Sequence, residues 1–447
     1  MGTRARRRVT ARYRWDRLRV SFWFAPVVMS LGAMLLAWVL YGIDGLIPNE
    51  LLEDSRLVLA GTPGELRSIL MSMAGTILAT AGVVFTLLTL PLSTVVAQYG
   101  SRLLRVFLGE STTQLVLGMF VATFVYCLSA ALSVLPAEVE PEGPQLTVTV
   151  GLLLSVASFA SLIVLVQHVS TMLQAPNIAA AAGAELRDVV IAELPDEAGS
   201  GDEPDGGVET FPGPLEETTG YPVRMREYGY IQYVDPDILL ALAGDKDLVV
   251  RLLRKPGHFV RRDMTVALVW PAGRVDDELD QQIRRAFQVG NVRTPTQDIT
   301  YAVNQLAEMA VRAMSPAIND PFTAMTCLDH IGEGLALFIR QGEKKPYLYD
   351  QAGRLRLIFE PVTFGELFSA AFDMLRHCSC DNASVLQHML DVIDTIGQGA
   401  RAPEVRQMLA RQVNLIGAEI QAGRLVDDDR QLIQRRSEAL VIKLSGA

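Results

Sequence analysis

The sequence contains few cysteines and lacks every familiar catalytic motif. Its four cysteines are too few and too scattered for the disulfide framework of a small secreted protein. No glycine-rich phosphate loop, Gly-x-Ser-x-Gly turn, His-Glu-x-x-His pair or paired-carboxylate motif occurs. The enzyme classes that these motifs define are therefore excluded, and we expect a protein that is not an enzyme and carries no cofactor.

Three of the cysteines lie in the second half of the chain, but their spacing does not favour a metal site. His377, Cys378 and Cys380 lie close together, with His388 beyond them, while Cys127 and Cys327 lie elsewhere. Zinc sites normally use a C-x(2–4)-C pair and a second pair of ligands, which this stretch does not supply. A turn at the end of a helix is the simpler interpretation, and we expect no bound metal.

Charged side chains are absent from four long apolar stretches. Asp, Glu, Lys and Arg do not occur in residues 20–41, 68–97, 112–135 or 147–170. A helix rises about 1.5 Å per residue, so each stretch is long enough to cross a bilayer core of about 30 Å. Pumps and voltage sensors normally need ionisable groups in the membrane. We therefore expect four transmembrane helices, the first of which is an uncleaved anchor. The absence of charges argues against a pump or a voltage sensor, but it is compatible with a passive pore.

The arginines indicate the orientation of these helices. An arm at residues 1–19 carries eight arginines and one acid, Asp16, and Arg102 and Arg105 follow the second stretch. The two other connecting loops are acidic. The positive-inside rule then places both termini in the cytoplasm. A basic arm before an apolar stretch is more often a topology signal, and the chain shows no zinc-finger spacing, so we expect the lipid bilayer, and not a nucleic acid, as its partner.

The second stretch carries a stripe of small and hydroxyl-bearing residues. Its hydroxyl residues recur at steps of about one or two helical turns: Ser72, Thr76, Thr80, Thr86 and Ser93. Gly75, Ala79 and Gly82 lie beside them. Such a stripe is typical of close helix–helix packing, but it would also suit a helix that lines a water-filled path. Arg102 and Arg105 could likewise form a positive ring in an oligomer, which would favour anions, or anchor the helix at the membrane interface.

The rest of the chain predicts a soluble α+β domain. Residues 193–220 are rich in Gly, Pro and acids and predict a flexible linker. Short β-rich runs predict a small β-subdomain at residues 221–273, and residues 274–447 predict a helical bundle. The fold class is therefore a membrane α-helical domain (residues 20–175) joined to an α+β cytoplasmic domain. Pro91 should kink or end the second membrane helix.

The densest polar group lies beside the helices of the soluble domain. It comprises Arg293, Gln297, Asp298, Asn304, Asn319 and Asp320. One interpretation is a ligand or ion site. The alternative is helix capping, because Thr294-Pro295 and Asp320-Pro321 both resemble helix starts, and Asp298 would then lie in the first turn near Arg293.

Several longer runs resemble one family of bacterial membrane proteins. They are YGSRLLRVFLGESTTQLVLGMFVATFVYCL, GYIQYVD, GHFVRRD and RTPTQDITYAVNQLAEMAVRAMSPAINDPFTAMTCLD. The chain is similar, over nearly its whole length, to the family catalogued as domain of unknown function 2254. The resemblance implies four membrane helices and a cytoplasmic domain, and it supplies no activity.

Two function hypotheses lead, and a lipid-handling or enzymatic role without a recognisable motif is a third. The first is a homo-oligomeric pore or ion channel of the bacterial inner membrane, lined by the second membrane helix and regulated by the cytoplasmic domain. The second is a membrane-anchored sensor or scaffold whose cytoplasmic domain binds a ligand or partner.

Overall fold

A computed structural model describes residues 23–46, 59, 61–99, 111–134, 144–172, 174–194, 217–422 and 424–446. The chain divides into two compact units, Met1–Asn177 and Ile178–Ala447. The arginine arm, the loop with Arg102 and Arg105, and residues 195–216 of the expected linker lie outside the described residues.

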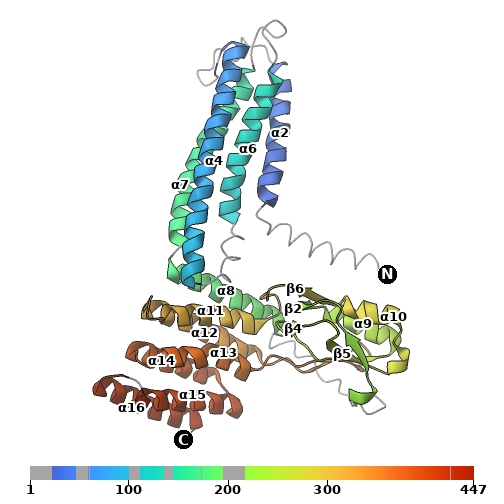
Figure 1. The fold of residues 1–447 in the computed structure, drawn as a ribbon, viewed down its shortest axis with the longest axis vertical. Coiled ribbons are helices and arrows are strands. Elements are labelled where there is room, and N and C mark those ends of the chain that lie inside the picture. The colour runs from blue at the N-terminus through green and yellow to red at the C-terminus, as the bar shows by residue number, and fades with distance from the viewer. Residues whose placement is uncertain are drawn as a thin grey trace. The chain divides into compact units, whose positions relative to one another are not determined.

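The first unit is a bundle of long helices that run side by side (Figure 1). They are α2 (Phe24–Asp44), α4 (Pro63–Tyr99), α6 (Ser111–Ser133) and α7 (Gln145–Met172). Helix α6 contacts each of the other three. Their apolar contacts form two clusters, one around Leu70 and Tyr126 and one around Ile77 and Phe120. Small residues such as Gly118 let the helices approach closely, as membrane helices commonly do.

Helix α4 does not end at Pro91. It continues without a break to Tyr99, so the expected helix end at Pro91 is wrong. A proline removes one backbone donor, and membrane helices tolerate that loss when neighbouring groups and local adjustments satisfy the freed carbonyl.

A carboxylate from α2 caps α7. Asp44, the last residue of α2, accepts hydrogen bonds from the backbone N–H groups of Leu146 (2.9 Å) and Thr147 (2.8 Å), and also from the Thr147 hydroxyl. The phenol of Tyr126 on α6 donates to the Thr147 carbonyl at 2.8 Å. One end of the bundle is thus held by polar bonds between three helices, at the first turn of α7 where backbone donors would otherwise be unpaired.

Among the described residues, five helices are long and apolar enough to cross a membrane. Besides the four of the first unit, α12 (Pro321–Gln341) in the second unit meets the same criteria of length and composition. The expected number of four transmembrane helices is therefore not confirmed.

The second unit combines strands and helices. Helix α8 (Ala175–Glu193) leads into it. The strands are β1 (Tyr221–Arg224), β2 (Gly229–Val234), β3 (Val249–Leu252), β4 (Phe259–Val260), β5 (Thr265–Trp270), β6 (Phe287–Gly290), β7 (Tyr347–Tyr349) and β8 (Leu355–Ile358). The short helices between the strands are η2 (Glu217–Thr219), α9 (Pro236–Lys246), η3 (Ala272–Arg274) and α10 (Asp277–Arg284).

The strands form two sheets. One has the order β1-β5-β3-β8-β7 and the other the order β4-β2-β6. All neighbouring strands are antiparallel except β3 and β8, which pair in parallel with Val250 opposite Leu357. The β-rich part therefore extends beyond the expected boundary at residue 273, because β6 and the β7–β8 hairpin join strands that lie earlier in the chain.

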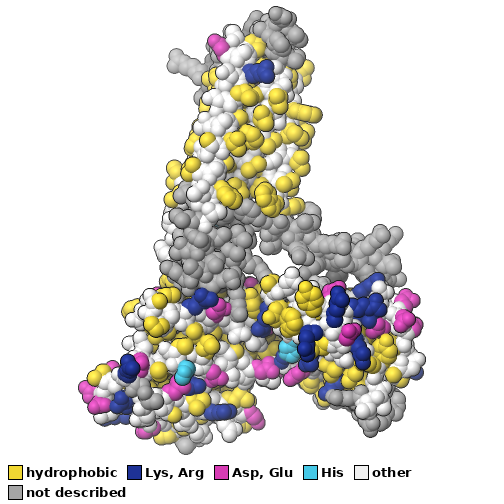
Figure 2. Space-filling view, in the orientation of Figure 1, with side chains coloured by type: hydrophobic (Ala, Val, Ile, Leu, Met, Phe, Trp, Pro, Cys, Tyr) yellow, Lys and Arg dark blue, Asp and Glu magenta, His cyan; other side chains and the backbone are white. Residues whose placement is uncertain are grey.

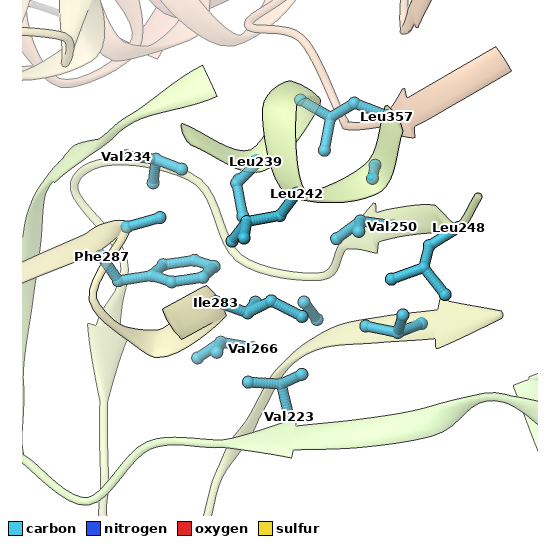
Figure 3. Packing of buried hydrophobic residues seen from close by; sticks show 14 of the residues in the cluster. Val223, Val234, Leu239, Leu242, Leu248, Val250, Val266, Ile283, Phe287 and Leu357 are labelled. Carbon is cyan, nitrogen blue, oxygen red and sulfur yellow. The ribbon is translucent and has the colours of Figure 1, made fainter. Parts of the chain in front are cut away.

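An apolar core joins these sheets to α9 and α10. Figure 3 shows Leu239 and Leu242 from α9 and Ile283 from α10 packed with Val223 and Val266 from the strands. These side chains are buried. Burial of each large aliphatic side chain contributes about 1.5–3 kcal/mol before chain entropy is counted.

The remaining helices form successive layers (Figure 1). They are α11 (Ile299–Ala313), α12, α13 (Phe364–Cys378), α14 (Ala383–Gly399), α15 (Pro403–Ala422) and α16 (Asp427–Ser445). Helix α11 contacts α12 and α13, α12 contacts α14, α13 contacts α15, and α15 contacts α16. Buried apolar residues at three- and four-residue steps, such as Leu328, Ile331 and Leu335 of α12, form the contact faces.

Candidate functional site

One face of α4 packs inside the bundle. Leu66, Leu70, Ala74, Ile77 and Val84 are buried, and they recur at steps of three, four and seven residues. Helix α4 contacts α6 and α7. The apolar periodicity therefore fixes which side of α4 faces its own protomer.

The hydroxyl stripe lies on the opposite side. Ser72, Thr76 and Thr86 are exposed, and Thr80 is half-buried. With an advance of 100° per residue, five small residues fall within a sector of roughly 80° opposite the buried face, whereas Thr76 lies on the flank of that sector and Thr80 lies nearer the buried face. These small residues are Ser72, Gly75, Ala79, Gly82 and Thr86. Among the described residues, no helix of the same chain covers Ser72, Thr76 and Thr86.

The threonine hydroxyls of the stripe bond to their own helix. Thr76 Oγ1 donates to the Ser72 carbonyl at 2.9 Å, Thr80 Oγ1 donates to the Thr76 carbonyl at 2.9 Å, and Thr86 Oγ1 donates to the Gly82 carbonyl at 3.0 Å. Each proton is therefore satisfied, while the oxygen keeps lone pairs that can accept from water or from another helix. Between Ser68 and Thr86, the outward surface of α4 is thus mildly polar along the stripe and holds no charge.

The glycines of the membrane helices differ in whether other side chains pack against them. A Cβ added at Gly118 of α6 would lie 2.7 Å from Met29 Sδ and 3.3 Å from the Pro26 Cα, so Gly118 serves packing within the bundle. A Cβ added at Gly75 or Gly82 of α4 would meet no atom within 4 Å. These two glycines therefore have no packing role within the described part of the protomer.

Three of the expected pore-lining residues cannot be placed as side chains. Ser93 belongs to α4, but its side chain lies outside the described part of the structure. Arg102 and Arg105 lie outside the described residues altogether.

In the second unit, Asp298 and Arg293 form a compact ion pair. Arg293 Nε donates to Asp298 Oδ2 at 2.8 Å, and Arg293 Nη2 donates to Oδ1 at 2.9 Å. Asp298 Oδ1 also accepts the Tyr301 backbone N–H at 2.9 Å and so caps α11. The Arg293 guanidinium lies 5.4 Å from the centre of the Tyr301 ring. Asp298, and not Thr294, is the cap, because α11 begins at Ile299.

Burial governs the acid–base behaviour of this pair. The Asp298 side chain is 3% exposed, and this burial raises its pKa, although the Arg293 guanidinium acts in the opposite direction. His258 lies nearby, and burial together with the positive charges of Lys255 and Arg254 lowers its pKa. Both Asp298 oxygens are bonded, to Arg293 and to the first turn of α11, which is typical of a structural pair.

The other members of the expected polar cluster serve the backbone. The Gln297 side chain accepts from the Val234 N–H at 2.8 Å and donates to the Val234 carbonyl at 3.1 Å, so it extends the edge of β2. Asp320 caps α12 through the Thr323 N–H at 3.1 Å, as its position before Pro321 predicts. Asn319 is exposed and has a φ of +48°, a conformation that Asn tolerates well.

These six residues do not form one site. Asp298 precedes α11 and Asn319 follows it, and a helix of 15 residues is about 22 Å long. Asn304 lies half-buried between them on α11. The capping interpretation therefore accounts for both ends of the cluster.

Two features were missed in the sequence. Gly257 has a φ of +89°, and a Cβ there would fall on the Asp298 carboxylate, so only glycine fits. Arg356 is 2% exposed and pairs with Asp350 and Asp247, each at 2.9 Å. In the sequence, the Gly257-His258 pair of the run GHFVRRD could have indicated the glycine requirement at position 257. No local pattern indicates the buried Arg356. In the described part of the chain, no three His, Cys, Asp or Glu side chains are arranged to hold a metal ion.

The long apolar helices of the first unit define the class as a multi-pass membrane protein. The family model described as "Predicted membrane protein" (domain of unknown function 2254) matches residues 19–395, and the chain belongs to this family. The resemblance found in the sequence is thus confirmed.

Relatives in two mycobacterial species carry no functional description. Uncharacterized proteins of Mycobacterium bovis and of Mycobacterium tuberculosis are each 27% identical to this chain over 428 residues, which cover 94% of the chain and 80% of the relative. No solved structure matches the chain.

Proposed function

We propose that the protein is a homo-oligomeric pore of the bacterial inner membrane, in which the outward face of α4 lines a water-filled path. The observation that carries this proposal is the position of Ser72, Thr76 and Thr86 on the face of α4 that the protomer leaves exposed. Four helices per chain are too few to enclose a path alone, so the path requires several copies.

The stripe face of α4 is poorly suited to contact with lipid. Lipid-facing positions of a membrane helix gain most from large apolar side chains, and elsewhere on α4 these are present, as at Leu78 and Phe85, which are 56% and 54% exposed. The stripe instead offers small residues and hydroxyl oxygens, which suit another helix or water. The back-bonded threonines support a path for small solutes without a fixed charge.

We assign the crossing helices to the first unit alone. Helix α12 carries Asp329 and packs against protein on several sides. Asp329 pairs with His388 of α14 at 2.7 Å, and a Cβ added at Gly332 would lie 2.6 Å from Val392 Cγ1. Because other helices of the second unit cover α12, this helix does not require a surrounding bilayer. We therefore assign four helices to the membrane and α12 to the second unit.

The positive-inside rule supports a cytoplasmic location for both termini. The arginine arm precedes α2, and Arg102 and Arg105 separate α4 from α6. The second unit then lies in the cytoplasm, where it would regulate the path. If α4 only anchors the protein, the second unit would instead act as a sensor or scaffold.

Cysteine accessibility tests this proposal. With exposed Cys378 and half-buried Cys380 replaced by serine, the remaining native thiols, Cys127 and Cys327, are buried. A membrane-impermeant thiol reagent should modify Thr86→Cys in nanodiscs at least about tenfold faster than Phe85→Cys, because thiolate forms only where water reaches. Phe85 lies at nearly the same depth on another side of α4, is 54% exposed and is the matched control.

Equal slow modification of both cysteines would contradict the proposed path. It would favour the anchored sensor or scaffold, in which the stripe meets another helix or lipid and no water.

A further inference from the structure

A surface of the second unit combines exposed aromatic residues with arginines. It lies where the two sheets diverge. The Met225 N–H donates to the Met264 carbonyl at 3.0 Å, and the Asp263 N–H donates to the Met225 carbonyl at 2.9 Å. Further along, Gly229 lies opposite Val260 and Tyr230 opposite Phe259. Residues 226–228 therefore run beside residues 261–263.

Strand alternation places the outward side chains on one face. Ile231 and Val260 are buried in the core, so Tyr230 and Phe259 point away from it. Their rings meet edge to face at 5.1 Å. Tyr228, Phe259 and Val292 remain 65%, 49% and 53% exposed, which is a large apolar area to leave in water.

Three exposed arginines border these residues. Arg226 is two residues before Tyr228, and Arg261 and Arg262 follow Phe259 closely. In the described part of the chain, no carboxylate pairs with any of the three. In the helical layers, by contrast, Arg376, Arg430 and Arg436 each form an ion pair with an acidic residue.

The local charge is positive in a chain whose net charge is −10. Two acids, Glu227 and Asp263, accompany the three arginines and the neighbouring exposed Arg224. Figure 2 shows Lys and Arg side chains gathered beside hydrophobic ones over the strand-bearing part of this unit. We call the set Arg226, Tyr228, Phe259, Arg261, Arg262 and Val292 the aromatic–arginine face.

We propose that the aromatic–arginine face docks onto the anionic surface of the bilayer that holds the chain's own helices. Arginine guanidinium groups bind lipid phosphates with paired hydrogen bonds, and aromatic rings enter the headgroup region of a membrane. The net positive charge of the face complements anionic lipids. The second unit begins at Ile178, only a few residues after α7 ends at Met172, so a short tether keeps bilayer within reach.

This inference does not depend on a pore. It requires only that the helices of the first unit lie in a membrane, and it would hold equally for a sensor or scaffold.

Hydrogen exchange of the full-length protein tests the proposal. The protein is placed in nanodiscs of phosphatidylcholine alone or of phosphatidylcholine mixed with phosphatidylglycerol. Backbone exchange in residues 224–231 and 258–264 should slow in the anionic discs, and high salt should remove the protection because it screens the charges. Each arginine near an anionic surface should account for about a fivefold change in the docking equilibrium.

Matched variants separate docking from folding. Arg261→Gln with Arg262→Gln should abolish the protection, whereas Arg411→Gln with Arg435→Gln, which removes the same charge from α15 and α16, should leave it intact. Unchanged exchange of α11 and α12 shows that the variants are folded.

Exchange that is the same in both lipids would overturn the proposal. Protection that appears in detergent and rises with protein concentration would also overturn it, and would assign the face to a second copy of the chain. Protection by an added oligonucleotide but not by anionic lipid would assign the face to nucleic acid.

Discussion

At the scale of single residues, Asp44 carries a contact between membrane helices. It caps the first turn of α7 from the last turn of α2, with two backbone N–H groups and one hydroxyl as donors. Asp44→Ala should lower stability by about 2 kcal/mol, since it removes a charged cap. Thermal unfolding in detergent, followed by helical circular dichroism, should show a lower Tm. Asp428→Ala, an exposed change in α16, is the control, and an equal Tm for both variants would contradict the assigned cap.

Gly257 is a second residue at which a single added carbon atom should lower the stability of the protein. Gly257→Ala should cost about 3 kcal/mol, because the methyl group meets the Asp298 carboxylate and the positive φ strains any L side chain. Gly244→Ala in α9, where a Cβ meets nothing within 4 Å, should be neutral or slightly stabilising. Urea unfolding of the full chain compares the two. Similar midpoints would show that the loop moves freely away from Asp298.

Asp350 gives the protein a specific response to acid. Partial burial would raise its pKa, but hydrogen bonds from the Arg354 and Ala352 N–H groups and the Arg356 side chain outweigh it and lower the pKa to about 2. A lowered carboxyl pKa contributes stability above the unfolded value near 4, and that stability is lost as the pH falls towards 2. Asp350→Asn should therefore show a smaller fall in Tm between pH 4 and pH 2 than the native chain. An identical pH profile would contradict this assignment.

At the scale of helices, α4 packs one face inside the bundle, and in the proposed pore its other face borders the path and the neighbouring copies. Gly75→Leu with Gly82→Leu should leave the protomer folded, since both positions face open space, but should lower the association constant by about tenfold or more. Gly118→Leu should instead lower the Tm, because it collides with Met29 and Pro26 inside the bundle. Native mass spectrometry and thermal unfolding separate the two effects. Unchanged assembly of the α4 variant would contradict the proposed contact.

Local patterns predicted much of the element structure. The uncharged apolar stretches correspond to α2, α4, α6 and α7, and Asp320-Pro321 begins α12. Gly353, with a φ of +75°, lies in the turn between β7 and β8, where a glycine is typical of a tight turn. These features depend on residues near one another in the chain, so sequence alone contains the required information.

Long-range pairing and helix direction could not be predicted in this way. The parallel pairing of Val250 with Leu357 joins segments more than a hundred residues apart, and the buried Arg356 depends on it. Thr294 was a plausible N-cap for α11, but the N-cap is Asp298. The segment before it is held in place because Arg293 pairs with Asp298 and Gln297 bonds to β2. The sequence located the stripe of α4, but only the packing of Leu70 and Ile77 shows that the stripe points outward.

At the scale of the whole molecule, we propose that several copies surround a path with the small, uncharged face of α4. The most direct measurement is unitary current across a planar bilayer that contains the purified full-length protein. Thr86 is exposed at the centre of the stripe, whereas Phe85 is 54% exposed on another side of the same helix. Native protein and Phe85→Trp should conduct, and Thr86→Trp should not, because its indole fills the path. A natively folded oligomer that carries no current under any voltage or salt, or a Thr86→Trp variant that conducts like the native protein, would contradict this proposal.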